Sequence, residues 1–264
     1  MKKSTSLYLL LIAFLTSNFN CKKDSRVPTG VSSNEIVHVQ TATLTLDSGL
    51  LCYLPFNSNL KDKSGQGNNG TLQGGNISYV ADRFGIASRA ISFSASNSWI
   101  EIPEADFAGL KTATIAMDFY PTTTGQQVLI SKMSYSAAIG SPDFYQSFAI
   151  VFEATAQLGF EIRQKGLCNG TTGWNPVLYS NVAVILNTWN HIAITFNNTR
   201  QKMYLNGNLV SSGTKTASPI CQGEPIRLGI WWQTDPEFYT GNMDEVRIYD
   251  RVLSQQEVKE LSKK

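Results

Sequence analysis

The chain has 264 residues, of which 42% are hydrophobic, 11% are aromatic and only 16% are charged. Its formal net charge is +2, and 20 basic and 20 acidic residues remain once the two lysines of the leader described below are removed. This near-neutral chain has no basic stripe and no acidic block, which argues against nucleic acid as a partner and against a solvating tail. Its length suits one large β domain, because β-sandwiches often exceed roughly 200 residues as single units.

Residues 1–21 are predicted to be an export signal. Two lysines precede an apolar run over Leu7–Leu15, which is too short to span a bilayer. Cys21 then resembles the acylated cysteine of a bacterial lipoprotein, although Asn20 stands where such sites usually place a small residue. Plain secretory cleavage is the alternative. We therefore expect an exported protein of the bacterial outer membrane, facing the periplasm or the cell surface, whose only membrane attachment is lipid.

Three further cysteines follow the leader, so at least one of them is free or pairs outside the chain. Cys168 and Cys221 lie in glycine-containing loops, whereas Cys52 lies inside the apolar run Leu50–Leu54. In an oxidising compartment we predict a disulfide between Cys168 and Cys221, with Cys52 as a small buried side chain. The chain has no Cys-x-x-Cys motif and only two histidines, which argues against a zinc site.

Residues 22–46 are rich in Ser, Thr and Val and are predicted to be a tether, although Ile36–Leu46 also fits an edge strand. The domain is predicted to occupy residues 47–264 and to begin with a buried strand over Leu50–Phe56. Turn-forming residues follow from Asn57 to Thr71.

Short predicted strands then recur along the chain. Ala90–Phe93 and Trp99–Pro103 alternate between apolar and polar residues and are predicted to form a hairpin. A second hairpin is predicted from Asn187–Phe196 and Lys202–Val210, and its second arm contains the turn dipeptide Asn206-Gly207. The other predicted strands are Thr114–Tyr120, Gln127–Lys132, Ser147–Glu153, Gly159–Gln164 and Ile226–Trp232, with long loops over Met133–Tyr145 and Lys165–Pro176.

The last strand and its tail end the domain. Apolar residues recur over Met243–Tyr249, which predicts a strand with one buried face. Ser254 followed three residues later by Glu257 forms a capping box, and Val258 and Leu261 give a short helix an apolar stripe. With about a dozen short strands and a helical pattern only at its end, the chain is predicted to be all-β: a two-sheet antiparallel jelly-roll sandwich with a short C-terminal helix.

Two segments carry a family resemblance. From Gly241 to Glu257 the chain reads Gly-x-Met-Asp-Glu-Val-Arg-Ile-Tyr-x-Arg-x-Leu-Ser-x-x-Glu, which resembles the C-terminal motif of concanavalin A-like, LamG/pentraxin-type jelly-roll modules of secreted bacterial proteins. From Asp62 to Gly70 it reads Asp-x-Ser-Gly-x-Gly-x-x-Gly, which is similar to the loop after the first strand of these modules. The resemblance implies the fold but says little about the ligand.

The resemblance also implies a structural calcium ion, because in these modules the first-strand loop and the last-strand aspartate lie together and often hold one. Calcium takes about six to eight oxygen ligands, and the ligands implied here are Asn57, Asp62 and Asp244. Such an ion would join the two ends of the domain and would not be catalytic. The alternative is that Asp62 caps a turn through its own backbone and that Asp244 pairs with a neighbouring arginine.

The same fold hosts glycoside hydrolases and lyases, so the fold does not decide between binding and catalysis. Laminarinase-type hydrolases carry Glu-x-Asp-x-x-Glu on one strand, and this chain has no such run. Glu153 and Glu161, on a predicted strand pair, are the candidates for two converging carboxylates. His191 has no Ser or Cys nucleophile in a strained turn nearby and is predicted to be a structural sheet residue.

Aromatic side chains point to carbohydrate. Sugars stack their flat C–H faces on exposed aromatic rings, while amides and carboxylates fix their orientation. Trp99 and Trp189 are predicted to be core residues. Trp231 and Trp232 are adjacent on one strand, so only one of the two can be buried in the sandwich. The predicted carbohydrate-binding residues are Trp174, Trp232, Tyr145, Gln233 and Asp235.

The sequence thus predicts a non-catalytic module of a cell-envelope lipoprotein that binds a glycan or glycoprotein. One alternative is a glycan hydrolase or lyase with an unrecognised active site, which predicts two carboxylates converging in a groove. Another alternative is a protein-interaction or adhesion domain, with other envelope proteins as candidate partners. This alternative predicts a flat apolar patch on the surface instead of a groove.

Overall fold

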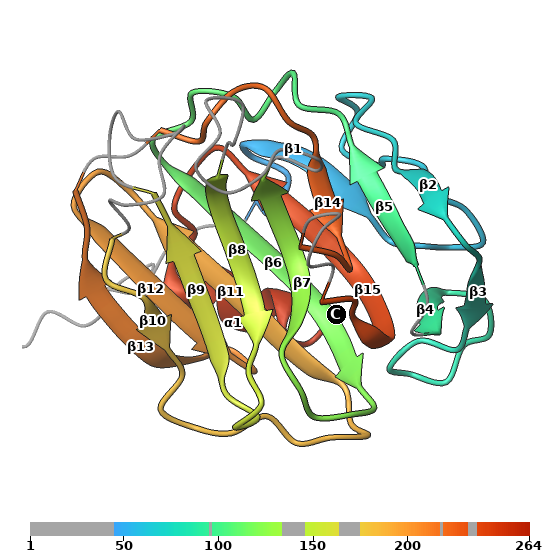
Figure 1. Cartoon of the computed structure of the whole chain (residues 1–264). Helices are drawn as coiled ribbons and strands as arrows, with labels where there is room; N and C mark the ends of the chain where they lie inside the picture. Colours follow the sequence, from blue (N-terminus) through green and yellow to red (C-terminus); the bar gives the residue numbers. More distant parts are fainter. Residues whose placement is uncertain (1–44, 95–96, 134–145, 164–174, 217–218, 232–236) are drawn as a thin grey trace, which may run out of the picture. The chain divides into compact units, whose positions relative to one another are not determined.

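A computed structural model describes residues 45–94, 97–133, 146–163, 175–216, 219–231 and 237–264. These residues form two antiparallel β-sheets that face each other, with one short helix outside them (Figure 1). The predicted all-β sandwich with a short C-terminal helix is therefore confirmed. No helix in the described ranges is both long and apolar enough to cross a bilayer.

Sheet A contains eight strands of the described chain, and all of its pairs are antiparallel. The strands are β1 (Leu50–Leu54), β3 (Ile77–Val80), β4 (Ala90–Ser94), β6 (Ala113–Pro121), β11 (Asn190–Phe196), β12 (Arg200–Leu205), β13 (Asn208–Thr214) and β15 (Thr240–Tyr249). Their order is β13-β12-β11-β6-β15-β4-β3, and β1 also pairs with β15.

Sheet B faces sheet A and contains seven described strands. They are β2 (Thr71–Gly74), β5 (Ser98–Ile102), β7 (Gln127–Met133), β8 (Gln146–Phe152), β9 (Leu158–Ile162), β10 (Leu178–Tyr179) and β14 (Ile226–Leu228). Their order is β10-β9-β8-β7-β14-β5-β2. The very short strands β2, β3 and β10 had no clear signal in the sequence.

One hydrophobic core lies between the sheets, because side chains alternate between the two faces of each strand. From sheet A, β6 contributes Ile115, Met117 and Phe119 to this core. From sheet B, β8 contributes Phe148 and Ile150. Each such side chain stabilises the fold by about 1.5–3 kcal/mol relative to an exposed one.

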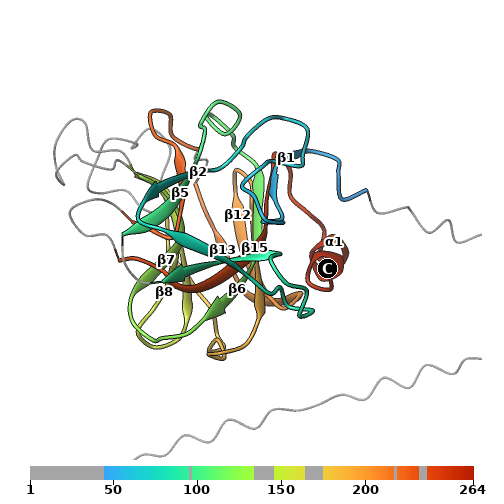
Figure 2. The same cartoon turned by 90° about the vertical axis from the view of Figure 1, so that its right-hand side faces the viewer.

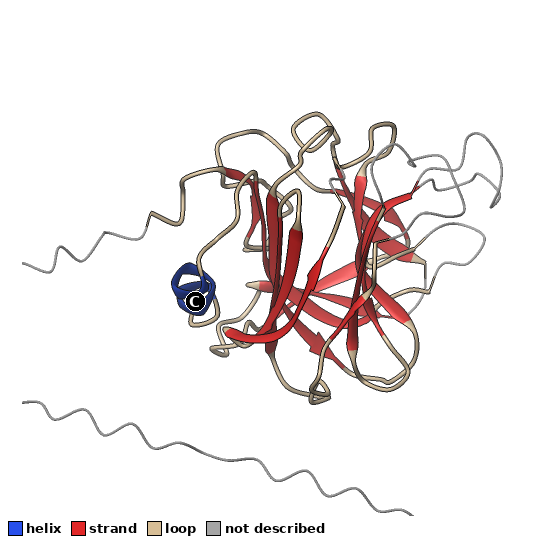
Figure 3. Cartoon of the chain, turned by 90° about the vertical axis from the view of Figure 1, so that its left-hand side faces the viewer, coloured by secondary structure: helices blue, strands red, loops and turns tan. Residues whose placement is uncertain are grey.

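The helix α1 (Gln255–Leu261) lies against the outer face of sheet A, the face away from sheet B (Figures 2 and 3). Val258 and Leu261 pack there with Tyr249. The Ser254 hydroxyl accepts a hydrogen bond from the Glu257 N–H, and the Glu257 carboxylate accepts one from the Ser254 N–H. The predicted capping box is therefore confirmed.

The predicted hairpin of Ala90–Phe93 with Trp99–Pro103 is wrong. In the structure β4 pairs with β3 and β15 in sheet A, whereas β5 pairs with β2 and β14 in sheet B. Phe93 and Ile100 reach the same core from opposite sides. Alternating apolar residues therefore fit two facing strands as well as two paired ones, and the sequence pattern did not distinguish the two arrangements.

The second predicted hairpin is confirmed in part. β11 pairs with β12, as predicted. The run Lys202–Val210, however, belongs to two strands, because the chain turns at Asn206-Gly207 and continues as β13, which pairs with β12. Asn206 and Gly207 have φ angles of +50° and +77°. Positive φ at both central residues is the geometry of a tight hairpin turn, which Asn-Gly favours.

The closing strand β15 contains an irregularity that shapes the site described below. One side of β15 pairs with β6, while its other side pairs first with β4 and then with β1. The register with β6 shifts between Asp244 and Arg247, and Glu245 has a φ of +54°. This bulge lies where the partner of β15 changes from β4 to β1, and it re-aims the side chains beside it.

Candidate functional site

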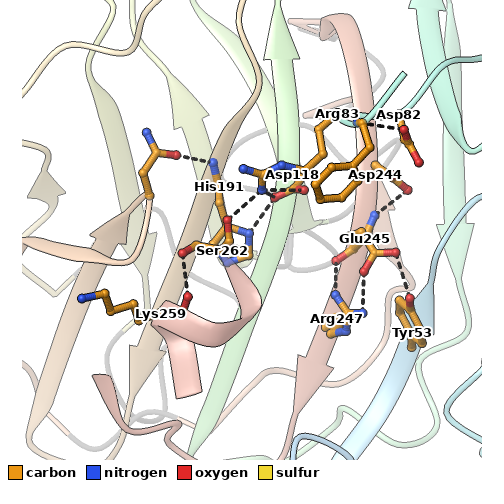
Figure 4. Close-up of polar contacts among 12 residues, drawn as sticks. Tyr53, Asp82, Arg83, Asp118, His191, Asp244, Glu245, Arg247, Lys259 and Ser262 are labelled. Carbon is orange, nitrogen blue, oxygen red and sulfur yellow. Dashed lines mark hydrogen bonds and ion pairs between the residues drawn. The ribbon is translucent and has the colours of Figure 1, made fainter. Parts of the chain in front are cut away.

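A pocket of about 350 Å³ opens beside the bulge of β15. We call it the Asp244 pocket. Its lining comes from both ends of the domain: Asn57 from the segment after β1, Asp82 and Arg83 from the connection between β3 and β4, and Asp244 and Arg247 from β15. Segments far apart in sequence therefore meet here, as the close-up in Figure 4 shows for several of them.

The backbone around the Asp244 pocket is unusual. Phe56 and Ser58, on either side of Asn57, have φ angles of +48° and +57°, and Ser88 has a φ of +62°. The Ser58 N–H donates to the Ser88 carbonyl at 2.9 Å, which joins these two segments. Such left-handed non-glycine residues cost about 1–3 kcal/mol each and tend to cluster at functional sites.

Asp244 lines the pocket with only 4% of its surface exposed. One of its carboxylate oxygens accepts a hydrogen bond from the Glu245 N–H at 2.8 Å. Burial raises the pKa of Asp244 to about 8, and the nearby carboxylates of Glu245, Asp118 and Asp82 add to this rise. Among the described residues no cation forms an ion pair with Asp244.

The two pocket arginines bind other carboxylates. Arg83 pairs with Asp118 at 3.2 Å and donates to the Ser262 carbonyl at 2.9 Å. Arg247 pairs with Glu245 at 2.5 Å, and its guanidinium lies 3.9 Å from the centre of the Tyr53 ring. The alternative expectation, that Asp244 pairs with an arginine, is therefore not met within the described chain.

Asp82 is the second buried carboxylate of the Asp244 pocket, and it was not among the predicted site residues. It is 8% exposed, and its Oδ1 accepts hydrogen bonds from the N–H groups of Phe84 and Ile86 at 2.9 and 2.8 Å. Around Asp82 the sequence indicates only a turn that ends at Gly85. The proximity of Asp82 to Asp244 arises from the fold and therefore has no local sequence signal.

Asp62, predicted as a calcium ligand with Asn57 and Asp244, does not line this pocket. Its Oδ1 accepts from the N–H groups of Tyr53 and Ser64, and its Oδ2 accepts from the Ser64 hydroxyl and the Asn68 N–H. Burial opposes ionisation of Asp62, but these hydrogen bonds outweigh it and lower the pKa. Asp62 therefore organises its own loop, as the alternative reading of the sequence expected.

His191 lies beyond Arg83 on the outer face of sheet A. Its Nδ1 is 2.7 Å from Asp118 Oδ1, and each side chain is only 1% exposed. The two residues are cross-strand partners on β11 and β6 (Figure 4). The prediction that His191 is a sheet residue is confirmed, and its burial keeps it from contact with a substrate.

The outer face of sheet B carries aromatic and charged side chains. Trp231 packs there on Val128 and Val151 and is 9% exposed. Nearby in the sheet, Arg227 Nε pairs with Glu101 at 2.9 Å, and the Trp99 ring N–H donates to the same carboxylate at 3.3 Å. This face thus combines rings with hydrogen-bonding groups.

The predicted core roles of Trp99 and Trp189 need correction. Trp99 is buried at 8% exposure, but β5 directs Ile100 and Ile102 into the core and Trp99 to the outer face. Trp189 is only partly buried and packs edge-to-face on Tyr120 with ring centres 5.7 Å apart. For Trp99 the alternation therefore predicted burial correctly but not the face of the sheet, and for Trp189 it overestimated burial.

Glu153 and Glu161, the candidate catalytic pair, are close enough to affect each other. Glu161 lies on β9 between the core residues Phe160 and Ile162, so it points to the outer face. Burial raises its pKa, and the charge of Glu153 adds to the rise. The two carboxylates therefore share one region of the outer face of sheet B.

The remaining predicted site residues lie outside the described residues: Tyr145, Trp174, Trp232, Gln233 and Asp235 for carbohydrate, Cys21 for lipid and Cys168 for the disulfide. Cys221 is described and 3% exposed, and its N–H donates to the Ser147 hydroxyl. Its pairing with Cys168 stays a prediction. Cys52 is a free thiol with no exposed surface, which confirms its expected buried role.

The two facing antiparallel sheets define the class of this protein as a jelly-roll sandwich. More particularly, the chain belongs to the concanavalin A-like lectin/glucanases superfamily, whose Laminin_G_3 model matches residues 94–259. The family resemblance carried by the sequence is thereby confirmed. No curated protein matches the chain in sequence.

Solved structures with the same fold are distant in sequence. Domain 4 of AbnA, an extracellular GH43 arabinanase from Geobacillus stearothermophilus solved with arabinotriose, is 22% identical with a TM-score of 0.59, and the match covers 81% of this chain and 98% of that one. The binding domain of Paraclostridial Mosquitocidal Protein 1 is 20% identical with a TM-score of 0.63, covering 83% and 52%. The receptor binding domain of botulinum neurotoxin D is 13% identical with a TM-score of 0.61, covering 83% and 53%. The chain spans about half the length of the two toxin chains, and these similarities establish the fold alone.

Proposed function

We propose that this chain is a non-catalytic module of an exported envelope lipoprotein that binds a glycan or glycoprotein on the outer face of sheet B. The observation that carries the proposal is the position of Trp231 on that face, because the predicted residues Trp232, Gln233 and Asp235 follow it directly in the chain. Trp231 itself is only 9% exposed, so the stacking rings of this proposal are the predicted tryptophans, and the Arg227–Glu101 pair on the same outer face supplies hydrogen-bonding groups of the kind that sugars require.

The strand ends of sheet B add support. Met133 pairs with Gln146, and Ile162 pairs with Phe148. The connections after β7 and after β9 therefore leave the sheet at the same end, and they hold Tyr145 and Trp174. The arabinotriose complex of the arabinanase domain is a precedent for a glycan bound to a domain of this fold.

A glycan array probed with residues 22–264 tests the proposal, followed by titration of the best glycan against Trp174→Ala and Trp232→Ala. Truncating a stacking tryptophan costs about 2 kcal/mol or more, so each variant should bind at least roughly thirty-fold more weakly. Trp189→Ala is the matched control, because Trp189 is a partly exposed tryptophan that packs on Tyr120 of sheet A and not on sheet B. Binding to no glycan, or an equal loss in the control, would contradict the proposal.

Glycan cleavage is the second candidate function, favoured by the neighbouring carboxylates of Glu153 and Glu161. Glycosidases use one carboxyl group as an acid and a second as a base or nucleophile. Incubation of the selected glycan with the protein, followed by a reducing-end assay, separates the two candidates. A binding module releases no product, and Glu161→Gln retains its affinity; release of product that Glu161→Gln abolishes would establish an enzyme instead.

A further inference from the structure

Tyr179 carries an exposed aromatic ring at the edge of the face to which we assign glycan binding. It lies on β10, the edge strand of sheet B beside β9, and 50% of its surface is exposed (Figure 1). Its neighbour Leu178 packs in the core, so Tyr179 points to the outer face of the sheet. A half-exposed ring on this face suits stacking on a sugar, and Tyr179 was not among the predicted site residues.

The sheet beside Tyr179 is bare, because the cross-strand partner of Tyr179 is Gly159. A Cβ on Gly159 would lie 2.7 Å from a methyl group of Val151, so a side chain there would have to displace Val151. The Tyr179 Cε1 and a Glu153 carboxylate oxygen each lie 3.4 Å from the same Cβ position. The ring and the carboxylate therefore flank one position of the sheet that carries no side chain.

Hydrogen bonds fix β10 on β9. The Ser180 N–H donates to the Leu158 carbonyl at 2.8 Å, and the Ser180 hydroxyl accepts from the Leu158 N–H at 3.0 Å. The side-chain amide of Gln157 donates to the Ser180 carbonyl at 2.9 Å. Tyr179 is therefore presented from a fixed backbone, which reduces the entropy lost when a ligand stacks on its ring.

Two carboxylates lie beside the ring. Glu161 follows Gly159 by two residues on β9 and therefore shares its outward face. Partial burial raises the pKa of Tyr179, and the charges of Glu153 and Glu161 add to the rise, so both carboxylates are close to the ring. Within the described chain neither carboxylate forms an ion pair or a side-chain hydrogen bond.

The cation nearest to these carboxylates in the strand is buried. Arg163, the next outward-facing residue on β9, opposes the rise in the pKa of Glu161 that burial and Glu153 cause, but it is only 1% exposed. A ligand that approaches Tyr179 thus meets two carboxylates and not the guanidinium of Arg163. Uronic acids and sulfated sugars are repelled there, whereas hydroxyl and amino groups can donate to the carboxylate oxygens.

We propose that Tyr179 stacks on a sugar unit of the bound glycan and that Glu153 and Glu161 restrict this position to sugars without negative charge. The inference rests on the proposed function and extends it to the edge of sheet B. Val151, on the strand β8 next to β9, packs with Trp231, so the bare position lies beside the region of the predicted tryptophan site. Adjacent strands are about 5 Å apart, so an oligosaccharide that runs across the strands reaches both.

Glycan binding by residues 22–264 tests the inference, on an array that presents neutral oligosaccharides beside counterparts carrying uronic acid or sulfate groups. The unchanged chain should select glycans without negative charge. Tyr179→Ala should bind the best of them about ten-fold or more weakly, because the stacking ring is lost. Tyr179→Phe should restore most of the affinity, because it restores the ring. Tyr79→Ala is the matched control, because Tyr79 is an exposed tyrosine of β3 in sheet A.

Glu153→Gln and Glu161→Gln test the restriction to sugars without negative charge. Each removes one charge from the site, so each should bind uronic acid glycans roughly three-fold or more tightly than the unchanged chain at low salt. The gain should shrink at high salt, because salt screens exposed charges. Glu260→Gln, on α1 outside sheet A, also removes one charge from the chain and should give no gain.

The outcomes separate this inference from the proposed function. Binding to no glycan would remove both. Binding that is lost in Trp174→Ala and Trp232→Ala but unchanged in Tyr179→Ala would leave the proposed function and overturn the stacking role. An equal loss in Tyr179→Ala and Tyr179→Phe would also overturn that role. Preference for acidic glycans, or no gain in either glutamine variant, would overturn the restriction.

Discussion

Lys215 is a buried amine whose charge is poorly compensated. It is 6% exposed, its Nζ has no hydrogen-bond partner in the described chain, and the ammonium lies 5.3 Å from the centre of the Phe196 ring. Burial lowers the pKa of Lys215 from 10.5 to about 8. The ring offsets part of the cost of burying the charge, because a cation is attracted to an aromatic face.

This pKa predicts a pH-dependent stability. Between about pH 8 and pH 10.5 the folded state has released the Lys215 proton while the unfolded state retains it, so stability rises with pH across this window. Lys215→Met removes the buried charge and should stabilise the chain by about 1–3 kcal/mol at pH 7. Urea unfolding from pH 7 to pH 10.5 measures this gain, which should shrink as pH rises.

Lys61→Met is the control for Lys215→Met, because Lys61 is exposed. Its effect on unfolding should be small and should not vary over the same pH range. A gain in Lys215→Met that stays constant with pH would show that improved packing, and not removal of a charge, stabilises the variant.

The candidate site was predictable only where its signals are local. The loop around Asp62 was predicted from its run of turn-forming residues. In the structure, hydrogen bonds between Asp62 and residues no more than nine positions away hold this loop together. Asp82 was missed because its approach to Asp244 depends on how β4 and β15 pair. The family resemblance predicted that Asn57 and Asp244 lie close together, and both line the Asp244 pocket. It did not predict that both carboxylate oxygens of Asp62 accept hydrogen bonds from nearby residues of the chain.

Among the elements, α1 was predicted best because its signals lie within one turn. The Ser254 box caps the helix, and Val258 and Leu261 fasten it to sheet A. Strand pairing was harder. β4 and β5 each carry a correct apolar alternation, but the alternation does not specify the partner strand, and the two entered different sheets.

Ser254→Ala should therefore lower the free energy of unfolding by about 1 kcal/mol, because the N–H of Glu257 loses its acceptor. For a domain of this size, that loss corresponds to a fall in Tm of about 2–4 °C. Thermal melting monitored by circular dichroism measures it. Gln256→Ala, at an exposed position of the same helix, should leave Tm nearly unchanged, and equal effects of the two substitutions would argue against the capping role.

At the scale of the whole molecule, the two ends of the domain are fastened to each other. Arg251, after β15, donates to the carbonyls of Ser48 and Thr45 at 2.6 and 3.2 Å. β1 pairs with the second half of β15. The described residues just before β1 are therefore held by the segment after β15, and the predicted tether, residues 22–46, directly precedes β1 in the sequence.

This attachment matters if Cys21 carries lipid, as we propose. Expression in a bacterium that processes lipoproteins should place the unchanged chain in the membrane fraction and label it with a fatty acid analogue, because acyl chains supply the membrane affinity. Cys21→Ser should lose the label and appear in the soluble fraction or the medium. Cys52→Ser is the control, because Cys52 is a buried free thiol that a lipid cannot reach. An unlabelled chain, soluble whether or not Cys21 is present, would favour plain secretory cleavage and would leave residues 22–46 without a role as a tether.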